Sequence, residues 1–335
     1  MSSNNQRKIS IIIPVHNASG YIERCLGAVF LSSYTRFECI VIDDNSTDNS
    51  VSLVEDYPVK LLKLNEHIGA ANARNMGARA ASGEILFFID ADVLILRDTL
   101  TEIAKTFFEQ PDTAALIGSL DNAPGDERFL SQFKSLFRHY IHQSSEEIVA
   151  TFWSGCGAIR RQIFLDYNGF DSRYQKSSIE DIELGLRLAA GNQKIKLQKQ
   201  IQVKHLKRWT LRDLIKTDIL DRGIPWTLLM LRYKSISKNL NLRFSQKVSV
   251  VTVFLLGFSP CLLLPPIQLP PNAPLLPVFI LGTILLVNCK FYRFLIRVRG
   301  IIFTLKVTPL HLLYFFYCGL SFIFAVVTYM LGKRS

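Results

Sequence analysis

Two carboxylates stand one residue apart at the end of an apolar run. Residues 85–89 are all apolar and are followed by Asp90, Ala91 and Asp92. A short apolar run suits a buried parallel strand, and open α/β sheets bind ligands at the carboxyl ends of such strands. Divalent cations prefer oxygen ligands and often bridge a carboxylate to substrate phosphates. The pair therefore predicts a site for a nucleotide diphosphate and a metal ion, with a solvated turn as the structural alternative.

An α/β domain must position these carboxylates. Apolar runs alternate with segments of helical composition, and the predicted order is strand 9–13, helix 21–30, strand 37–42, strand 59–64, helix 70–81 and strand 85–89. This alternation predicts a mostly parallel sheet with helices on its faces. The strand 37–42 also ends in acids, so acids at two adjacent strand tips could hold a nucleotide between them. The chain has no G-x-x-x-x-G-K-[ST], and no G-x-G-x-x-G follows its first strand, which disfavours P-loop NTPases and dinucleotide dehydrogenases.

Charge divides the chain into two parts. The 335 residues include 39 Lys and Arg against 28 Asp and Glu, a formal net charge of +11, yet no acidic residue follows Asp221. The bases after Asp221 flank apolar segments, a pattern typical of anionic lipid headgroups as partners and not of nucleic acid. We therefore expect a catalytic domain of residues 1–221, a basic juxtamembrane segment of residues 222–247 and a membrane region of residues 248–335.

The membrane region has three predicted parts. Residues 248–289 lack charged side chains and are long enough for a hairpin of two spans of about 20 residues each. Bases and aromatics at helical spacing in residues 290–305 predict a helix in the membrane interface, and the uncharged residues 307–332 could cross again. The positive-inside rule places the catalytic domain in the cytoplasm of a multi-pass protein of the cell (inner) membrane. Buried core helices of a soluble domain are the alternative, and the topology of the last segment stays open.

Cysteine usage and the N-terminus agree with that compartment. The six cysteines are scattered without a C-x-x-C pair, so neither a disulfide framework nor a zinc site is indicated. Residues 1–8 are polar and run into the first strand, so we expect no signal peptide.

Five segments carry a resemblance to a known family. In order they read SIIIPVHN (10–17), IVIDDNSTD (40–48), GAANARNMG (69–77), GEILFFIDAD (83–92) and IEDIELG (179–185). Their residues and order resemble the family 2 glycosyltransferases of the GT-A fold. The resemblance implies a Rossmann-like α/β domain and an inverting enzyme that moves a sugar from a nucleotide-diphosphate donor.

The same resemblance implies roles at the donor site. Asp44 would contact the base, Asp90 the ribose side of the nucleotide, and Asp92 an Mn²⁺ or Mg²⁺ ion on the diphosphate. The resemblance also assigns to the nucleotide pocket Pro14, His16, Asn17, Arg74, Asn75 and Ala91. Structural roles remain alternatives for the single residues, such as Pro14 as a strand stop and Asn17 as a helix cap.

Asp181 and Glu180 supply the acid–base chemistry that the donor site lacks. Displacement at an anomeric carbon by a hydroxyl group needs a base to take the proton, and a carboxylate near the acceptor can do this. We assign Asp181 as the base, with Glu180 beside it; the alternative is an acidic first turn of a helix at residues 181–190. In the family, a loop such as residues 152–158 faces the sugar and the acceptor, so Ser154 and Gly155 are candidate acceptor contacts.

A second informative stretch lies at residues 202–209. In metal-dependent members of this fold a late histidine completes the metal ligands, which makes His205 a candidate. His205, Arg208 and Trp209 have the spacing of the Q-x-x-R-W motif of processive membrane synthases, with His in place of Gln. Trp209 could stack on an acceptor sugar or anchor the chain at the interface, and Arg208 belongs to the same acceptor set. Arg222 could reach the donor diphosphate or a lipid phosphate.

Three functions follow from these residues. The first is an inverting glycosyltransferase in the membrane that acts on a hydroxyl of a lipid or lipid-linked glycan, with anionic lipids as further partners. The second is a polyprenyl-phosphate sugar synthase, similar to dolichol-phosphate mannose synthase, and the third is a scaffold that binds sugar nucleotides without catalysis. Glu180 and Asp181 favour the first, because an ionised phosphate acceptor needs no base. The sugar, the base of the nucleotide and a homo-oligomeric state stay open.

Overall fold

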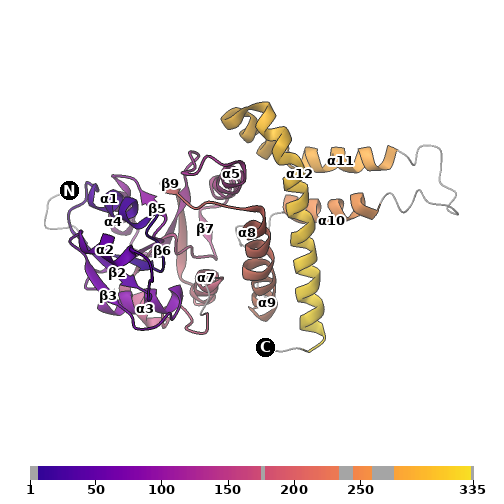
Figure 1. Ribbon diagram of the computed structural model, residues 1–335. Helices are drawn as coiled ribbons and strands as arrows, with labels where there is room; N and C mark the ends of the chain where they lie inside the picture. Colours follow the sequence, from indigo (N-terminus) through magenta and orange to yellow (C-terminus); the bar gives the residue numbers. More distant parts are fainter. Residues whose placement is uncertain (1–6, 175–177, 234–243, 259–274, 333–335) are drawn as a thin grey trace. The chain divides into compact units, whose positions relative to one another are not determined.

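The computed structural model describes residues 7–174, 178–233, 244–258 and 275–332 of the chain (Figure 1). The chain divides into two compact units, Met1–Trp209 and Thr210–Ser335. The first unit thus ends before Asp221, the boundary that the change in charge predicts, because residues 211–223 fold with the helices that follow them.

Strands and helices alternate in the first unit. Its strands are β1 (Ile9–Val15), β2 (Phe37–Asp43), β3 (Lys60–Lys63), β4 (Ile85–Ile89), β5 (Val93–Ile95), β6 (Thr113–Leu120), β7 (Ile148–Val149), β8 (Cys156–Arg160) and β9 (Lys194–His205). Its helices are α1 (Ile22–Phe30), α2 (Ser50–Glu55), α3 (Ala70–Ala80), α4 (Thr99–Glu109), α5 (Phe129–Gln143), α6 (Arg161–Asp166) and α7 (Glu180–Ala190). The predicted strands and helices of residues 9–89 are confirmed to within a few residues.

The strands form a nine-stranded sheet in the order β3-β2-β1-β4-β8-β6-β9-β5, and β7 pairs with β9. Strands β3, β2, β1 and β4 are parallel to one another, as the alternation of strands and helices predicts. Strand β8 is antiparallel to β4 and β6, which the sequence did not predict. The carboxyl ends of β2 and β4 therefore lie on the same edge of the sheet, on either side of β1.

The core explains why the central strands are so apolar. Every residue of β4 is fully buried, as are Ile11, Ile12 and Ile13 of β1, because helices cover both faces of a parallel sheet. Helix α3 packs on β1 and β2 through Gly77, where a Cβ atom would come within 2.6 Å of the side chains of Ile12 and Ile42.

The second unit is helical. It contains α8 (Leu211–Lys216), the π-helix η2 (Thr217–Gly223), α9 (Ile224–Tyr233), α10 (Phe244–Phe258), α11 (Leu276–Val287) and α12 (Cys289–Met330). Val253, Ile284 and Phe315 from α10, α11 and α12 form its core cluster. Asn288 donates a hydrogen bond of 2.7 Å from Nδ2 to Ser249 Oγ, which ties the end of α11 to α10.

Helix α12 joins two predicted segments. Its backbone is broken at Gly300, where φ is 83° and ψ is 173°, a conformation that glycine adopts readily. The break therefore falls inside the predicted interfacial segment of residues 290–305.

Among the described residues, α12 is the one helix long and apolar enough to cross a membrane, and α10 and α11 are shorter apolar helices. The predicted hairpin of residues 248–289 falls partly on α10 and α11, but its tip lies outside the described residues.

Candidate active site

The carboxylates that follow β4 emerge from the core at the open edge of the sheet. The chain turns at once, because Val93 N donates to Asp90 O at 3.0 Å and β5 begins. The side chains of Asp90 and Asp92 are 36% and 20% exposed, whereas the strand before them is buried. Ala91 lies between them and is partly exposed. A ligand can therefore reach the carboxylates of Asp90 and Asp92, which the buried strand β4 holds in place.

Arg74 links Asp90 to the acidic helix α7. Its guanidinium contacts Asp90 Oδ1 at 2.6 Å through Nη2 and Glu180 Oε1 at 3.0 Å through Nη1. The side chains of Arg74 and Glu180 are each 3% exposed. Burial alone would lower the pKa of Arg74, but the charges of Asp90 and Glu180 outweigh it and raise this pKa, so the guanidinium stays charged. The predicted donor residue Asp90 and the predicted catalytic residue Glu180 thus belong to one site.

The first turn of α7 carries Glu180 and Asp181 together. Glu180 Oε2 accepts a hydrogen bond of 2.7 Å from Ser178 N, and Asp181 Oδ1 accepts one of 2.8 Å from Ile182 N. The unpaired amides of a helix N-terminus favour negative charge, and both acids are buried there. The helix that was the structural alternative for Asp181 is present, and it presents the carboxylate at the site.

Ser154 lies against the predicted base. Its backbone N and its Oγ are 3.2 Å and 3.4 Å from Asp181 Oδ2. Gly155 next to it has no room for a side chain, because a Cβ atom would lie 2.7 Å from Trp153 Nε1. The small-residue loop thus adjoins the base, as its assignment to the acceptor side requires; its contact with an acceptor stays a prediction.

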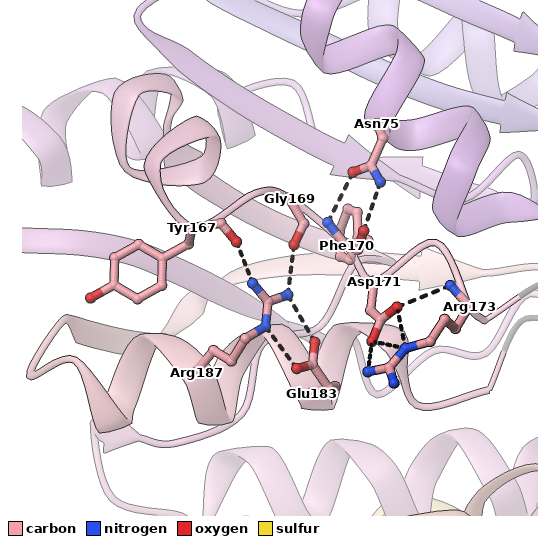
Figure 2. Close-up of polar contacts among 8 residues, drawn as sticks. All are labelled: Asn75, Tyr167, Gly169, Phe170, Asp171, Arg173, Glu183 and Arg187. Carbon is pink, nitrogen blue, oxygen red and sulfur yellow. Dashed lines mark hydrogen bonds and ion pairs between the residues drawn. The ribbon is translucent and has the colours of Figure 1, made fainter.

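A short turn fastens α7 to the rest of the unit, as Figure 2 shows. The Arg187 guanidinium contacts Glu183 through Nε and Nη2 at 2.7 Å and 2.8 Å, and it donates to the backbone carbonyls of Tyr167 and Gly169. These bonds hold one helical turn of α7 against residues 167–169. No sequence motif above includes this contact between Arg187 and Glu183, although their spacing of four residues in a helix was a usable signal.

Asn75 fastens the same turn to α3. Its Oδ1 accepts from Phe170 N at 2.9 Å and its Nδ2 donates to Phe170 O at 2.7 Å (Figure 2). The Phe170 ring lies 5.7 Å from the Arg74 guanidinium carbon, within the range of a cation–π contact. Gly169 has a φ of 63°, and a Cβ atom there would meet Asn75 Oδ1 at 2.4 Å. Both amide atoms of Asn75 thus serve the backbone, and its predicted contact with the nucleotide stays a prediction.

The acids at the end of β2 have a different environment. Asp44 is 2% exposed and accepts hydrogen bonds from Ile68 N at 2.8 Å and Gly69 N at 2.9 Å. His67 Nδ1 lies 2.9 Å from Asp44 Oδ2, and His16 Nδ1 lies 2.8 Å from the Asp44 carbonyl oxygen. Asp44 therefore organises the loop that begins α3, and its predicted contact with the base stays a prediction.

Pro14 and Asn17 line the same corner. Pro14 pairs with Ile42 of β2 and lies beyond the part of β1 that pairs with β4, so its missing N–H interrupts no bond to β4. Asn17 has a φ of 51° and its Oδ1 accepts from Thr47 N at 2.8 Å. Both residues therefore have structural roles beside His16, and their predicted contacts with the nucleotide stay predictions.

Asp92 and His205 form the candidate metal site. Strands β5 and β9 pair so that Val93 lies opposite His205, and His205 Nε2 is 3.4 Å from Asp92 Oδ1. Burial raises the pKa of Asp92, but His205 and then Lys207 outweigh burial, so this pKa lies below its usual value. Neighbouring ligands of an Mg²⁺ ion are about 3 Å apart when each lies about 2.1 Å from the ion, so the two atoms fit a shared cation.

That cation would need ligands from elsewhere. No group of three or more His, Cys, Asp and Glu residues suited to a metal occurs in the described part of the chain. Phosphate oxygens and water are the usual remaining ligands of Mg²⁺ at such sites. The pair therefore suits a metal that arrives with a diphosphate.

The residues that follow β9 lie only partly at this site. Trp209 N donates to Ser131 Oγ at 2.9 Å, and the ammonium of Lys207 lies 4.5 Å from the centre of the Trp209 ring. Arg208 is exposed. Arg222 belongs to η2 in the second unit, so it is not placed relative to these residues.

Known glycosyltransferases are similar to the first part of the chain. Residues 10–167 match the protein-family model described as glycosyl transferase family 2. Uncharacterized glycosyltransferase YibD of Escherichia coli (strain K12) is 36% identical over 124 residues, which cover 36% of this chain and 34% of that protein. Glycosyltransferase GlyG of Streptococcus pneumoniae serotype 4 is 30% identical over 119 residues, 34% of this chain and 39% of that protein. The chain thus spans less than two fifths of the length of these relatives.

Solved structures agree on the fold. The mannosyltransferase PcManGT of Pyrobaculum calidifontis, in complex with GDP-Man and Mn²⁺, matches with a TM-score of 0.53 at 18% identity, over 98% of this chain and 88% of that chain. TarS 1-349 of S. aureus, in complex with UDP, matches with a TM-score of 0.51 at 19% identity, over 97% and 92%. The predicted GT-A fold is confirmed.

Proposed function

We propose that this chain, which carries a glycosyl transferase family 2 domain, transfers a sugar from a nucleotide-diphosphate sugar to a hydroxyl group of a membrane lipid or lipid-linked glycan. The observation that carries the proposal is the bridge through Arg74. Its bonds of 2.6 Å to Asp90 and 3.0 Å to Glu180 join the strand end suited to a donor to the helix that bears Asp181. Donor and base can therefore act on one reacting carbon.

The donor is a nucleotide-diphosphate sugar. PcManGT and TarS, which share the fold, are described in complexes with GDP-Man and with UDP. In this chain Asp90 and Asp92 are partly exposed carboxylates at the carboxyl end of β4, and His16 lies at that of the neighbouring strand β1. Mn²⁺ or Mg²⁺ bound by Asp92 and His205 would supply positive charge to the departing diphosphate.

Asp181 is the general base. As the acceptor oxygen attacks the anomeric carbon, its proton passes to the Asp181 carboxylate, and the bond from that carbon to the diphosphate oxygen breaks. The nucleoside diphosphate leaves with the electron pair of that bond. Attack from the face opposite the diphosphate inverts the configuration of the sugar. Ser154 positions the carboxylate through its N–H and hydroxyl group.

The second unit supports a membrane acceptor. Helix α12 is apolar over a length that can cross a bilayer, and its apolar part exposes large side chains such as Ile302, Phe322 and Phe324. The part before Gly300 exposes Lys290, Arg293 and Arg297, which share one helix face. Such bases attract anionic lipid headgroups. We place the protein in the cell (inner) membrane with its catalytic unit in the cytoplasm.

The test of this function uses the full-length protein in liposomes. Wild type is screened against nucleotide sugars with extracted membrane lipid as acceptor, and transfer of labelled sugar is measured. Asp181→Asn should then lower transfer by about 100- to 10,000-fold, because general-base removal of a proton is worth that much, while donor affinity changes little.

Two other results would favour the two alternative functions. If Asp181→Asn retains more than about a tenth of wild-type turnover while Asp92→Asn is inactive, the acceptor is a lipid phosphate that needs no base. A wild type that binds nucleotide sugars but transfers none to any lipid acceptor would be a binding scaffold.

A further inference from the structure

Lys207 is an exposed cation close to the candidate metal site, where its charge lowers the pKa of Asp92. It is exposed, and within the described residues no hydrogen bond or ion pair engages its ammonium. Lys204, three positions earlier, differs: its Nζ lies 2.7 Å from Asp121 Oδ2 and also contacts the Ala123 carbonyl. The two lysines therefore differ. The ammonium of Lys204 has oxygen acceptors in the protein, and that of Lys207 has none among the described residues.

The ammonium of Lys207 is nevertheless restrained. It lies 4.5 Å from the centre of the Trp209 ring, and the ammonium of Lys134 lies 5.8 Å from the same ring. Cations within about 6 Å of an indole face are attracted to it, which limits the freedom of a long side chain. The ring is thus engaged with cations of the protein, and the stacking of Trp209 on an acceptor sugar stays a prediction.

The backbone around Lys207 is fastened to the candidate metal site. Leu206 N donates to Asp92 O at 2.8 Å, and His205 Nε2 lies 3.4 Å from Asp92 Oδ1. The residue immediately before Lys207 is therefore bonded to Asp92 itself. A diphosphate that shares a cation with Asp92 and His205 would lie next to this short segment.

We propose that Lys207 is a donor-binding residue whose ammonium contacts the β-phosphate of the nucleoside diphosphate. The inference rests on the proposed function, since it assumes that a diphosphate lies at Asp92. A divalent cation offsets only part of the charge that collects on the leaving group, and an ammonium is a strong donor to phosphate oxygens. The resemblance to a Q-x-x-R-W motif points instead to the neighbouring Arg208, and the described structure shows no contact that directs Arg208 to the site.

The test measures binding and not turnover. Calorimetry with Mn²⁺ present compares GDP and UDP with GMP and UMP, for wild type, Lys207→Met, Lys207→Arg and the matched control Lys204→Met. Loss of one charge-assisted contact should weaken binding of the diphosphate by about 10- to 100-fold and that of the monophosphate by no more than about threefold. Lys207→Arg should restore most of the diphosphate affinity, and Lys204→Met should match wild type.

Several results would overturn the inference. They are an unchanged diphosphate affinity in Lys207→Met, an equal loss for monophosphate and diphosphate, or a selective loss that appears in Arg208→Met instead. A wild type that binds no nucleoside diphosphate, whatever its base, would overturn the proposed function, and the inference with it. A wild type that binds one of them and transfers sugar keeps the function, so the Lys207 variants then decide the inference alone.

Discussion

The ends of strands β2 and β4 look alike in the sequence and differ in the structure. Both are apolar runs that end in two acids on the same edge of one sheet. At the end of β2, Asp44 is 2% exposed and bonds to backbone amides. At the end of β4, the side chains of Asp90 and Asp92 remain 36% and 20% exposed and pair with the side chains of Arg74 and His205, which themselves belong to the site.

The difference teaches what decides the role of such an acid. A buried carboxylate that accepts from N–H groups of the chain has its hydrogen-bonding capacity used by the fold. A partly exposed carboxylate whose partners are Arg or His side chains keeps oxygens for a ligand. The β2 end should therefore matter mainly for the loop that starts α3, and the β4 end mainly for the reaction.

The largest expected effect is at Asp92. Asp92→Asn keeps the size of the side chain and removes its charge, so turnover should fall at least about 100-fold through weaker stabilisation of the leaving group. The free energy of unfolding should change by less than about 1 kcal/mol, as is usual away from buried networks. Transfer assays and denaturant titration measure both. Full activity of this variant in excess chelator would remove the metal from the reaction.

The next effect is at Asp44. Asp44→Ala leaves the amides of Ile68 and Gly69 without their acceptor, and each unsatisfied buried donor costs about 1–3 kcal/mol. We expect the free energy of unfolding to fall by about 2–4 kcal/mol, as measured by urea titration. A variant as stable as wild type that has lost only nucleotide affinity would show that Asp44 serves the ligand, and the contrast with Asp92 would disappear.

The pH dependence of stability sharpens the comparison at the other end of β2. Glu38 is buried enough to raise its pKa, but hydrogen bonds from Ser10 and Ser82 and the charge of Lys8 outweigh burial and lower this pKa to about 2. Because the folded-state pKa lies below the unfolded value of about 4.3, the stabilisation is complete above pH 4.3 and disappears as the pH falls toward about 2. Glu38→Gln should show a flatter loss of stability in this window. A parallel pH profile of the two proteins would contradict the assignment.

The smallest effect is expected at His67. Its side chain is 52% exposed, although it lies 2.9 Å from Asp44 Oδ2. A contact between side chains this exposed contributes no more than about 1 kcal/mol, so His67→Ala should lower the free energy of unfolding by less than about 1 kcal/mol. A loss as large as that of Asp44→Ala would mean that His67, and not the amides, secures Asp44.

Much of the fold follows from local pattern. The alternation of apolar runs and helical segments predicts the strands and helices of residues 9–89, because hydrophobic periodicity and strand ends are local properties. The antiparallel insertion of β8 between β4 and β6 does not follow, because strand order depends on contacts between residues far apart in the chain. The same holds for Gly300, whose φ of 83° divides α12 before the predicted end of the basic segment.

The site divides in a similar way. The motifs predict Asp90, Asp92, Asp181 and His205 as the residues of interest, and the structure brings Asp92 to His205. The backbone contacts of Asn75 and Arg187 were not predictable, because only the folded chain places atoms of residues 167–170 beside them. Sequence spacing shows which side chains can do chemistry, but it does not show which of them will form hydrogen bonds with the backbone.

The sequence by itself determined the chemical types at each strand end, the apolar runs that bury the strands and the uncharged stretch of residues 307–330 in α12, since these are properties of composition and order. Tertiary structure alone decided which carboxylates stay accessible. Asp44 and Asp90 both follow a buried strand, yet the loop before α3 turns its amides toward Asp44, whereas Arg74 from the same helix reaches Asp90 and leaves it partly exposed. Tertiary packing determines which groups meet as hydrogen-bond partners, and these contacts exist only in the folded chain.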